Sequence, residues 1–246
     1  MLLLIFLGAS CARKAEEFKY EKDQTELYFE SEIKSLISEN KNLDNVDGVS
    51  PIINAVNKNY LDSVRLLIKN GANVNVRESH TGSTALHAAV APATAPRPNE
   101  MEEKIIRLLL ENNADMTIAD NMGITPLSKA AANGRLEAFN ILLEAGANPQ
   151  DLDGNGLNAL HHAASKGYYE IVQILIDREM DVNKLTSRNE SPLDLANHKT
   201  SKRDYENARQ TDEDAFPGAD YEKTIEILKE AGALTGKEIS PSETRN

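Results

Sequence analysis

The chain carries the stretch Thr84-Ala85-Leu86-His87 and returns to closely similar stretches along most of its length. The other copies are Thr125-Pro126-Leu127-Ser128, Asn158-Ala159-Leu160-His161, Ser191-Pro192-Leu193-Asp194 and, in weaker form, Ser50-Pro51-Ile52-Ile53. From the first copy to the last, their first residues lie 34, 41, 33 and 33 positions apart. A period near 33 residues predicts a stack of similar helical units that offers a long surface to another molecule.

Each copy opens a predicted pair of helices. A Ser or Thr hydroxyl suits the N-cap, and in three copies a proline follows where its missing N–H costs nothing. The first helix carries small residues that let neighbouring helices approach closely, namely Ala88-Ala89, Ala130-Ala131 and Ala163-Ala164. The second helix carries large apolar residues and ends at a position suited to left-handed backbone, occupied by Gly71, Asn113, Gly146, Glu179 and Gly232. Glu179 departs from the pattern, and we expect it to cost some stability.

This motif, its period and its helix pattern resemble the ankyrin repeat family over about residues 45–234. The resemblance implies an all-α repeat solenoid of stacked helix–turn–helix repeats with short β-hairpin arms. It implies that His87 and His161, at the fourth place of the motif, brace the backbone between adjacent repeats. It also implies that partner proteins dock on a concave face made of the hairpin tips and the exposed ends of the first helices.

The spacing of the repeats also predicts the domain boundaries of the chain. Residues 26–45 predict a degenerate N-terminal cap repeat, residues 46–234 about five ankyrin repeats, and residues 235–246 a flexible tail. The distance from the motif to the end of the second helix is 21 residues in three repeats, 29 in the second and 41 in the fifth. Insertions are therefore expected near residues 91–100 and 199–220, either as binding elements or as tolerated, disordered loops.

The N-terminus carries a separate signal. Residues 1–10 form an apolar run that ends in small residues, and Cys11, the one cysteine of the chain, follows directly. This arrangement resembles a bacterial lipoprotein signal peptide and implies that Cys11 is lipidated, with residues 11–25 as a tether. The protein would then be anchored in the bacterial cell envelope, periplasm-facing or surface-exposed. The alternative is a short apolar tail with an incidental cysteine.

Charge and composition narrow the range of partners. Lys and Arg number 27 against 39 Asp and Glu, which gives a formal net charge of -12. A nucleic-acid partner is not expected, because no run of basic residues could neutralise phosphates. The run at the N-terminus is too short to span a bilayer, so membrane contact is expected only through the lipid on Cys11.

No catalytic or metal site is expected. The remaining histidines, His80, His162 and His198, lack partners at metal-ligand spacing in the sequence. Asp151-Leu152-Asp153-Gly154-Asn155-Gly156 matches the first half of an EF-hand loop, but His162 stands where that loop needs a bidentate glutamate. A turn between repeats is therefore the preferred interpretation, and no cofactor is predicted.

The sequence therefore predicts a non-catalytic, monomeric scaffold that binds a partner protein on the concave ankyrin surface. The alternative is an inhibitor, immunity or protective factor for an exported enzyme or toxin. The resemblance places the binding residues at the hairpin tips: His80, Ser83, Asn121, Met122, Ile124, Asn155, Leu157, Arg188 and Glu190. Met122, Ile124 and Leu157 are the expected apolar anchors, unless they pack against neighbouring hairpins.

Overall fold

The computed structural model describes residues 24–46, 48–91, 99–199 and 220–240. The predicted signal peptide, Cys11, nearly all of the tether and most of both insertions lie outside the described residues. The described residues fall into two compact units, divided after Lys41. The first unit contains helix α2 (Gln24–Ser38), which lies mostly within the predicted cap repeat of residues 26–45.

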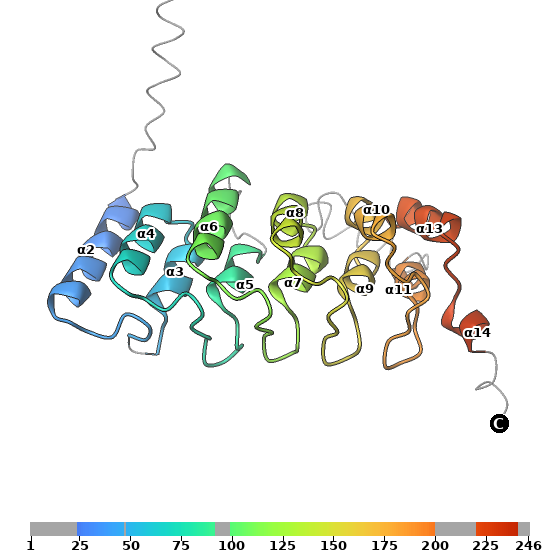
Figure 1. Cartoon of the computed structure of the whole chain (residues 1–246), viewed down its shortest axis with the longest axis horizontal. Helices are drawn as coiled ribbons and strands as arrows, with labels where there is room; N and C mark the ends of the chain where they lie inside the picture. Colours follow the sequence, from blue (N-terminus) through green and yellow to red (C-terminus); the bar gives the residue numbers. More distant parts are fainter. Residues whose placement is uncertain (1–23, 47, 92–98, 200–219, 241–246) are drawn as a thin grey trace, which may run out of the picture. The chain divides into compact units, whose positions relative to one another are not determined.

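The described part of the second unit contains five helix pairs that follow one another in chain order (Figure 1). The pairs are α3 (Pro51–Asn57) with α4 (Leu61–Lys69), α5 (Ala85–Ala89) with α6 (Asn99–Glu111), α7 (Pro126–Ala132) with α8 (Leu136–Glu144), α9 (Ala159–Ala164) with α10 (Tyr169–Asp177), and α11 (Pro192–Lys199) with α13 (Tyr221–Glu230). The first helices contact one another along one layer, and the second helices do so along the other. In the described ranges every regular element is helical, which confirms the predicted all-α solenoid.

Residue size explains the two layers. Ala130, Ala131, Ala163 and Ala164 in the first helices are fully buried, so these helices approach without side-chain volume between them. The second helices fill the space beside them with large side chains that are also fully buried, among them Phe139, Leu142, Ile171 and Leu175. Burying such a side chain contributes roughly 1.5–3 kcal/mol, and a single repeat has no neighbour against which to bury it.

The second helices end at the predicted positions. Gly71, Asn113, Gly146, Glu179 and Gly232 have φ angles of 86°, 63°, 98°, 60° and 83°, all in the left-handed region. Glu179 is therefore a residue with a Cβ in a conformation that favours glycine, as the repeat register predicted.

Two features of the fold differ from the expectations. The arms between repeats are tight loops rather than β-hairpins, and in the part of the chain that the structure describes no strand is formed. Residues 236–239, expected in a flexible tail, form the short helix α14 (Gly236–Ile239). Gly236 is buried, and its N–H donates to Oδ2 of Asp194 at 2.6 Å, so the tail folds back against α11 of the last repeat.

Candidate protein-binding surface

Four loops lie along the arm edge of the second unit (Figure 1), and we call residues 78–83, 120–124, 153–157 and 186–190 the tip row. Three of these loops share one construction. Oδ1 of Asp120 accepts the N–H groups of Met122 and Ile124 at 2.9 and 3.1 Å. In the next loop, Oδ1 of Asp153 accepts the N–H groups of Asn155 and Leu157. In the last loop, the hydroxyl oxygen of Thr186 accepts the N–H groups of Arg188 and Glu190. One short acceptor side chain thus fixes each loop from within.

The loops of the tip row are also bonded to one another. The N–H of Asn121 donates to the carbonyl oxygen of Thr81 at 2.8 Å. In the same way, the N–H of Gly154 donates to the carbonyl oxygen of Met122 at 2.9 Å, and the N–H of Ser187 donates to that of Asn155 at 3.0 Å. The approach is close, because a Cβ on Gly123 would lie 2.7 Å from the nitrogen of Gly154. The tip row is therefore one continuously hydrogen-bonded surface.

The structure places most predicted binding residues at this surface. Met122 is 62% exposed. His80, Asn121, Asn155 and Arg188 are also exposed, whereas Ser83, Leu157 and Glu190 are half-buried.

Ile124 is the exception, and its prediction as an outward-facing anchor is wrong. It is only 8% exposed. Its N–H donates to Asp120, and its carbonyl oxygen accepts from Nε2 of His87 at 2.9 Å. The backbone is thus held on both sides, where the loop enters α7.

The two motif histidines link neighbouring repeats, as predicted. The Nδ1 atom of His87 accepts the N–H of Thr84 in its own repeat, and its Nε2–H donates to Ile124 in the next. His161 likewise accepts from Asn158 and donates to the carbonyl oxygen of Lys184 at 2.9 Å. Burial lowers the pKa of both rings, that of His161 from 6.5 to about 4. Both are therefore neutral near pH 7, with one donor and one acceptor each.

The structure also shows a buried pair that was not predicted. Nε2 of His162 on α9 lies 3.2 Å from Oδ2 of Asp153, although the geometry is not that of a hydrogen bond. Lys129 on α7 occupies the equivalent position in the preceding repeat and forms an ion pair with Asp120, with Nζ 3.9 Å from Oδ2. In both pairs the basic residue follows the aspartate by nine positions, a spacing that could have indicated them. Burial lowers the pKa of His162, and the charge of Asp153 offsets part of this effect.

The segment that resembles an EF-hand is one of the tip loops. Oδ1 of Asp153 accepts hydrogen bonds from two N–H groups of its own loop. Oδ1 of Asp151 accepts a hydrogen bond from the side-chain amide of Asn148 at 2.6 Å. Gly156 takes a φ of 78° at the place held by Gly123 in the preceding loop. These relations confirm that the segment is the turn between repeats three and four.

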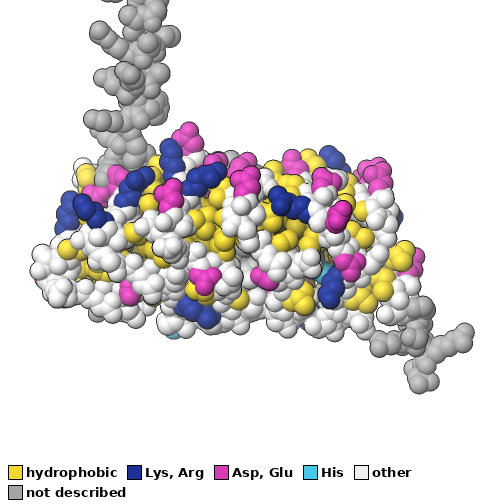
Figure 2. All heavy atoms as spheres, in the orientation of Figure 1, with side chains coloured by type: hydrophobic (Ala, Val, Ile, Leu, Met, Phe, Trp, Pro, Cys, Tyr) yellow, Lys and Arg dark blue, Asp and Glu magenta, His cyan; other side chains and the backbone are white. Residues whose placement is uncertain are grey.

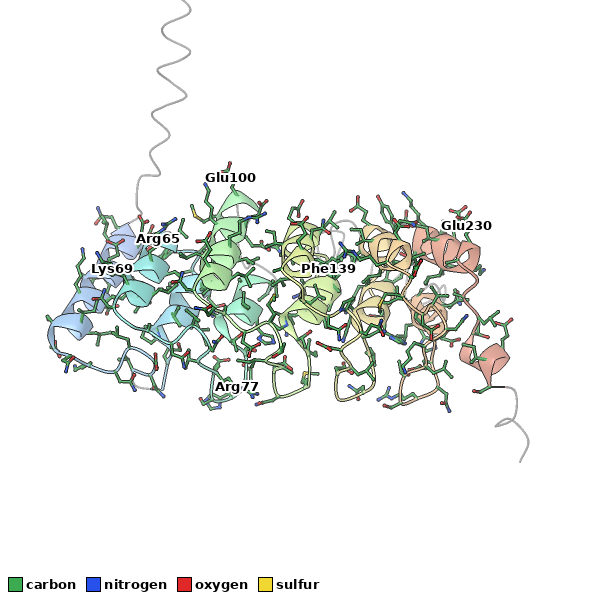
Figure 3. The ribbon with its side chains drawn as sticks, viewed as in Figure 1. Arg65, Lys69, Arg77, Glu100, Phe139 and Glu230 are labelled. Atoms are coloured by element: carbon green, nitrogen blue, oxygen red, sulfur yellow. The ribbon has the colours of Figure 1, made fainter. Side chains whose placement is uncertain are left out.

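Charge is distributed unevenly over the second unit. Figure 2 shows that Lys, Arg, Asp and Glu gather along the edge formed by the second helices, whereas the arm edge of this face is mostly uncharged. In Figure 3, Glu100 and Glu230 lie on the second-helix edge, and Arg77 lies at the arms.

In the residues that the structure describes, no helix is long and apolar enough to cross a membrane. Among the exposed apolar residues of the described ranges that were not singled out from the sequence are Leu152 beside a tip, 49% exposed, and Val49 before α3, 54% exposed.

Stacked helix pairs joined by hydrogen-bonded arms define a helical-repeat protein. The chain belongs to the ankyrin repeat family: the family model for ankyrin repeats in three copies matches residues 28–94, 93–186 and 145–202. Ankyrin repeats imply a role in protein–protein interaction, and the family is generally non-catalytic.

Several other proteins are similar in sequence to part of the repeat region. The chain is 39% identical over 92 residues to the nuclear factor NF-kappa-B p105 subunit of Gallus gallus, covering 37% of this chain and 9% of that protein. It is 36% identical over 98 residues to the B-cell lymphoma 3 protein homolog of Mus musculus, covering 39% and 20%. It is 36% identical over 86 residues to the 2-5A-dependent ribonuclease of Homo sapiens, covering 35% and 10%. The matched region is thus at most a fifth of each of these relatives.

Proposed function

We propose that the protein is a non-catalytic, monomeric scaffold that binds a partner protein on the concave ankyrin surface. This surface consists of the tip row and the exposed ends of the first helices, and we call it the first-helix face. Binding is centred on the tip row of repeats three and four. The observation that carries this proposal is the exposure of Met122, an apolar side chain that is 62% exposed on a backbone fixed from two directions. Its N–H donates to Asp120, and its carbonyl oxygen accepts from Gly154. An apolar side chain presented in this way costs solubility unless a partner covers it.

The rigidity of the tip row supports the same proposal. A surface that is ordered before binding loses less conformational entropy when a partner docks. Met122 supplies the apolar anchor, half-buried Leu157 adds to it, and exposed Asn121 and Asn155 supply a polar rim. Interfaces of this kind place apolar anchors at the centre and hydrogen-bonding groups around them.

The two motif histidines serve the stack itself. Both ring nitrogens of His87 and of His161 form hydrogen bonds within the stack, so the role of these side chains is structural.

We further propose that lipidation of Cys11 tethers the repeats to the bacterial cell envelope. A partner that is itself an exported enzyme or toxin would make the protein its inhibitor, immunity or protective factor.

Capture of partners from a cell-envelope extract tests the binding proposal. The bait proteins are the wild type, Met122→Asp on the tip row, and Arg107→Asp on the exposed surface of α6 as the matched control. We expect a protein that the wild type and the control retain and that Met122→Asp loses. Equal retention by all three proteins, or loss with the control alone, contradicts the proposed surface.

A further inference from the structure

A groove of about 130 Å³ opens on the first-helix face of the first repeat, away from the tips of repeats three and four. It lies between the segment before α3, the helix itself and the arm of the second repeat. Its lining residues are Val49, Ser50, Ile53, Asn54, Asn57 and Glu78.

One part of the groove is apolar. Val49 is 54% exposed, unusually so for a β-branched apolar residue, and Ile53 is nearly buried at 5%. These side chains offer contact to an alkyl chain. Covering Val49 would remove apolar surface from water, at a gain of roughly 25 cal/mol per Å².

The polar part of the groove contains a buried hydroxyl with no use inside the repeat. Ser50 is 9% exposed, and in the described part of the chain its Oγ has no hydrogen-bond partner. It stands at the N-cap of α3 without capping it, whereas Thr125 and Ser191 at the same place accept an N–H of their own helices. A buried hydroxyl without a partner costs about 1–3 kcal/mol, so a ligand that hydrogen-bonds to it recovers that cost. The Oγ atom has lone pairs that can accept from a donor-only group.

A carboxylate completes the groove. Oε2 of Glu78 accepts from the hydroxyl of Thr81 at 2.5 Å, and among the described residues the carboxylate makes no other hydrogen bond. Arg77, the preceding residue, forms no ion pair with Glu78 in the described part of the chain, and donates instead to the carbonyl oxygen of Gly82 and to Oδ1 of Asn121. The groove therefore offers a negative charge together with acceptor oxygens.

We propose that this groove binds a lysine side chain of the partner protein. A lysine has a long alkyl stem for Val49 and Ile53, and its ammonium is a donor-only group that matches Ser50 and Glu78. An acidic side chain would be repelled by Glu78, and an apolar one would leave Ser50 without a partner. This inference rests on the proposed protein-binding function and adds a charged contact in the arm that precedes the arm of Met122.

The test is a titration of the ¹⁵N-labelled full chain with the peptide acetyl-Gly-Lys-Gly-amide, followed by amide chemical shifts. The matched peptide carries norleucine, which keeps the alkyl stem and lacks the ammonium. We expect saturable shifts at Ser50, Asn54 and Glu78 with lysine, weakened by added salt, and several-fold smaller shifts with norleucine. Equal shifts with both peptides would show a merely apolar cleft, and no shift at these residues would equally overturn the proposal.

Two variants locate the contact. Glu78→Gln should weaken lysine binding by about fivefold, the upper range for a partly exposed ion pair, while Glu137→Gln on α8 should leave it unchanged. Ser50→Ala, which removes no internal hydrogen bond, should fold as the wild type does and also weaken binding. If the peptide fails to bind while a partner is captured through Met122, the lysine site is wrong and the proposed function stands. If the peptide binds and no partner depends on Met122, the proposed tip surface fails instead.

Discussion

The N–H of Gly154 donates a 2.9 Å hydrogen bond to the carbonyl oxygen of Met122, so the tips of repeats three and four form one backbone network. This bond requires the two loops to approach closely, and Gly123 permits that approach. With a φ of 81° and no side chain, it stands where a Cβ would lie 2.7 Å from the nitrogen of Gly154.

Gly123→Ala should therefore destabilise the stack twice over. The left-handed backbone disfavours a Cβ by about 1–2 kcal/mol, and displacement of Gly154 would break the bond between the tips at a further cost of about 1 kcal/mol. Gly146→Ala is the matched control, because its φ is 98° but no atom lies within 4 Å of the added Cβ. Urea unfolding should show a larger loss for Gly123→Ala, and equal losses would mean that contact between the tips contributes nothing.

Glu179→Gly should stabilise the protein. Glu179 has a φ of 60° where three other repeats have glycine, and removing its Cβ should raise the free energy of unfolding by roughly 0.5–1 kcal/mol. The gain is modest because glycine also increases the entropy of the unfolded chain. Thermal and urea unfolding measure the change, and a loss of stability would show that the glutamate side chain makes a contribution larger than its backbone strain.

Stability should fall as the solution becomes acidic. Because burial lowers the pKa of His161 from 6.5 to about 4, the unfolded chain binds a proton more readily than the folded one. The stability from this group is complete above pH 6.5 and is lost as the pH falls through 4, by roughly 3 kcal/mol. His87 acts in the same direction. In His161→Gln the free energy of unfolding should change less steeply between pH 7 and 4, and an unchanged slope would contradict the assignment.

Cys11→Ala should release the protein from the membrane fraction and abolish incorporation of labelled fatty acid. The reason is the apolar run and the small residues that directly precede Cys11. Membrane retention of the variant equal to that of the wild type, with no fatty acid on either, would contradict lipidation.

The sequence predicted those parts of the molecule that depend on position within a repeat. The period placed the helix ends correctly, so that Glu179 could be assigned left-handed backbone although glutamate rarely adopts it. It did not predict the burial of Ile124, because the same register position holds half-buried Leu157 in the next repeat. Packing around each loop, rather than the motif, decides that difference. Helix α14 and the Asp153–His162 pair were missed for a related reason, since each depends on at least one residue outside the four-residue motif, Gly236 in the first case and both partners in the second.

Ile124→Ala separates packing from binding at the tip row. Ile124 is 8% exposed and Met122 is 62% exposed, two positions apart in one loop. The buried side chain should cost about 2–4 kcal/mol of stability when truncated, and the exposed one less than about 0.5 kcal/mol.

The most direct test of the proposed tip surface is the affinity of a captured partner for Met122→Ala, measured by isothermal titration calorimetry beside the wild type. We predict that binding weakens by roughly 1–2 kcal/mol, about 5- to 30-fold, while the free energy of unfolding stays within about 0.5 kcal/mol of the wild type. Unchanged affinity, with or without a loss of stability, would contradict the claim that the tip row of repeats three and four is the protein-binding surface.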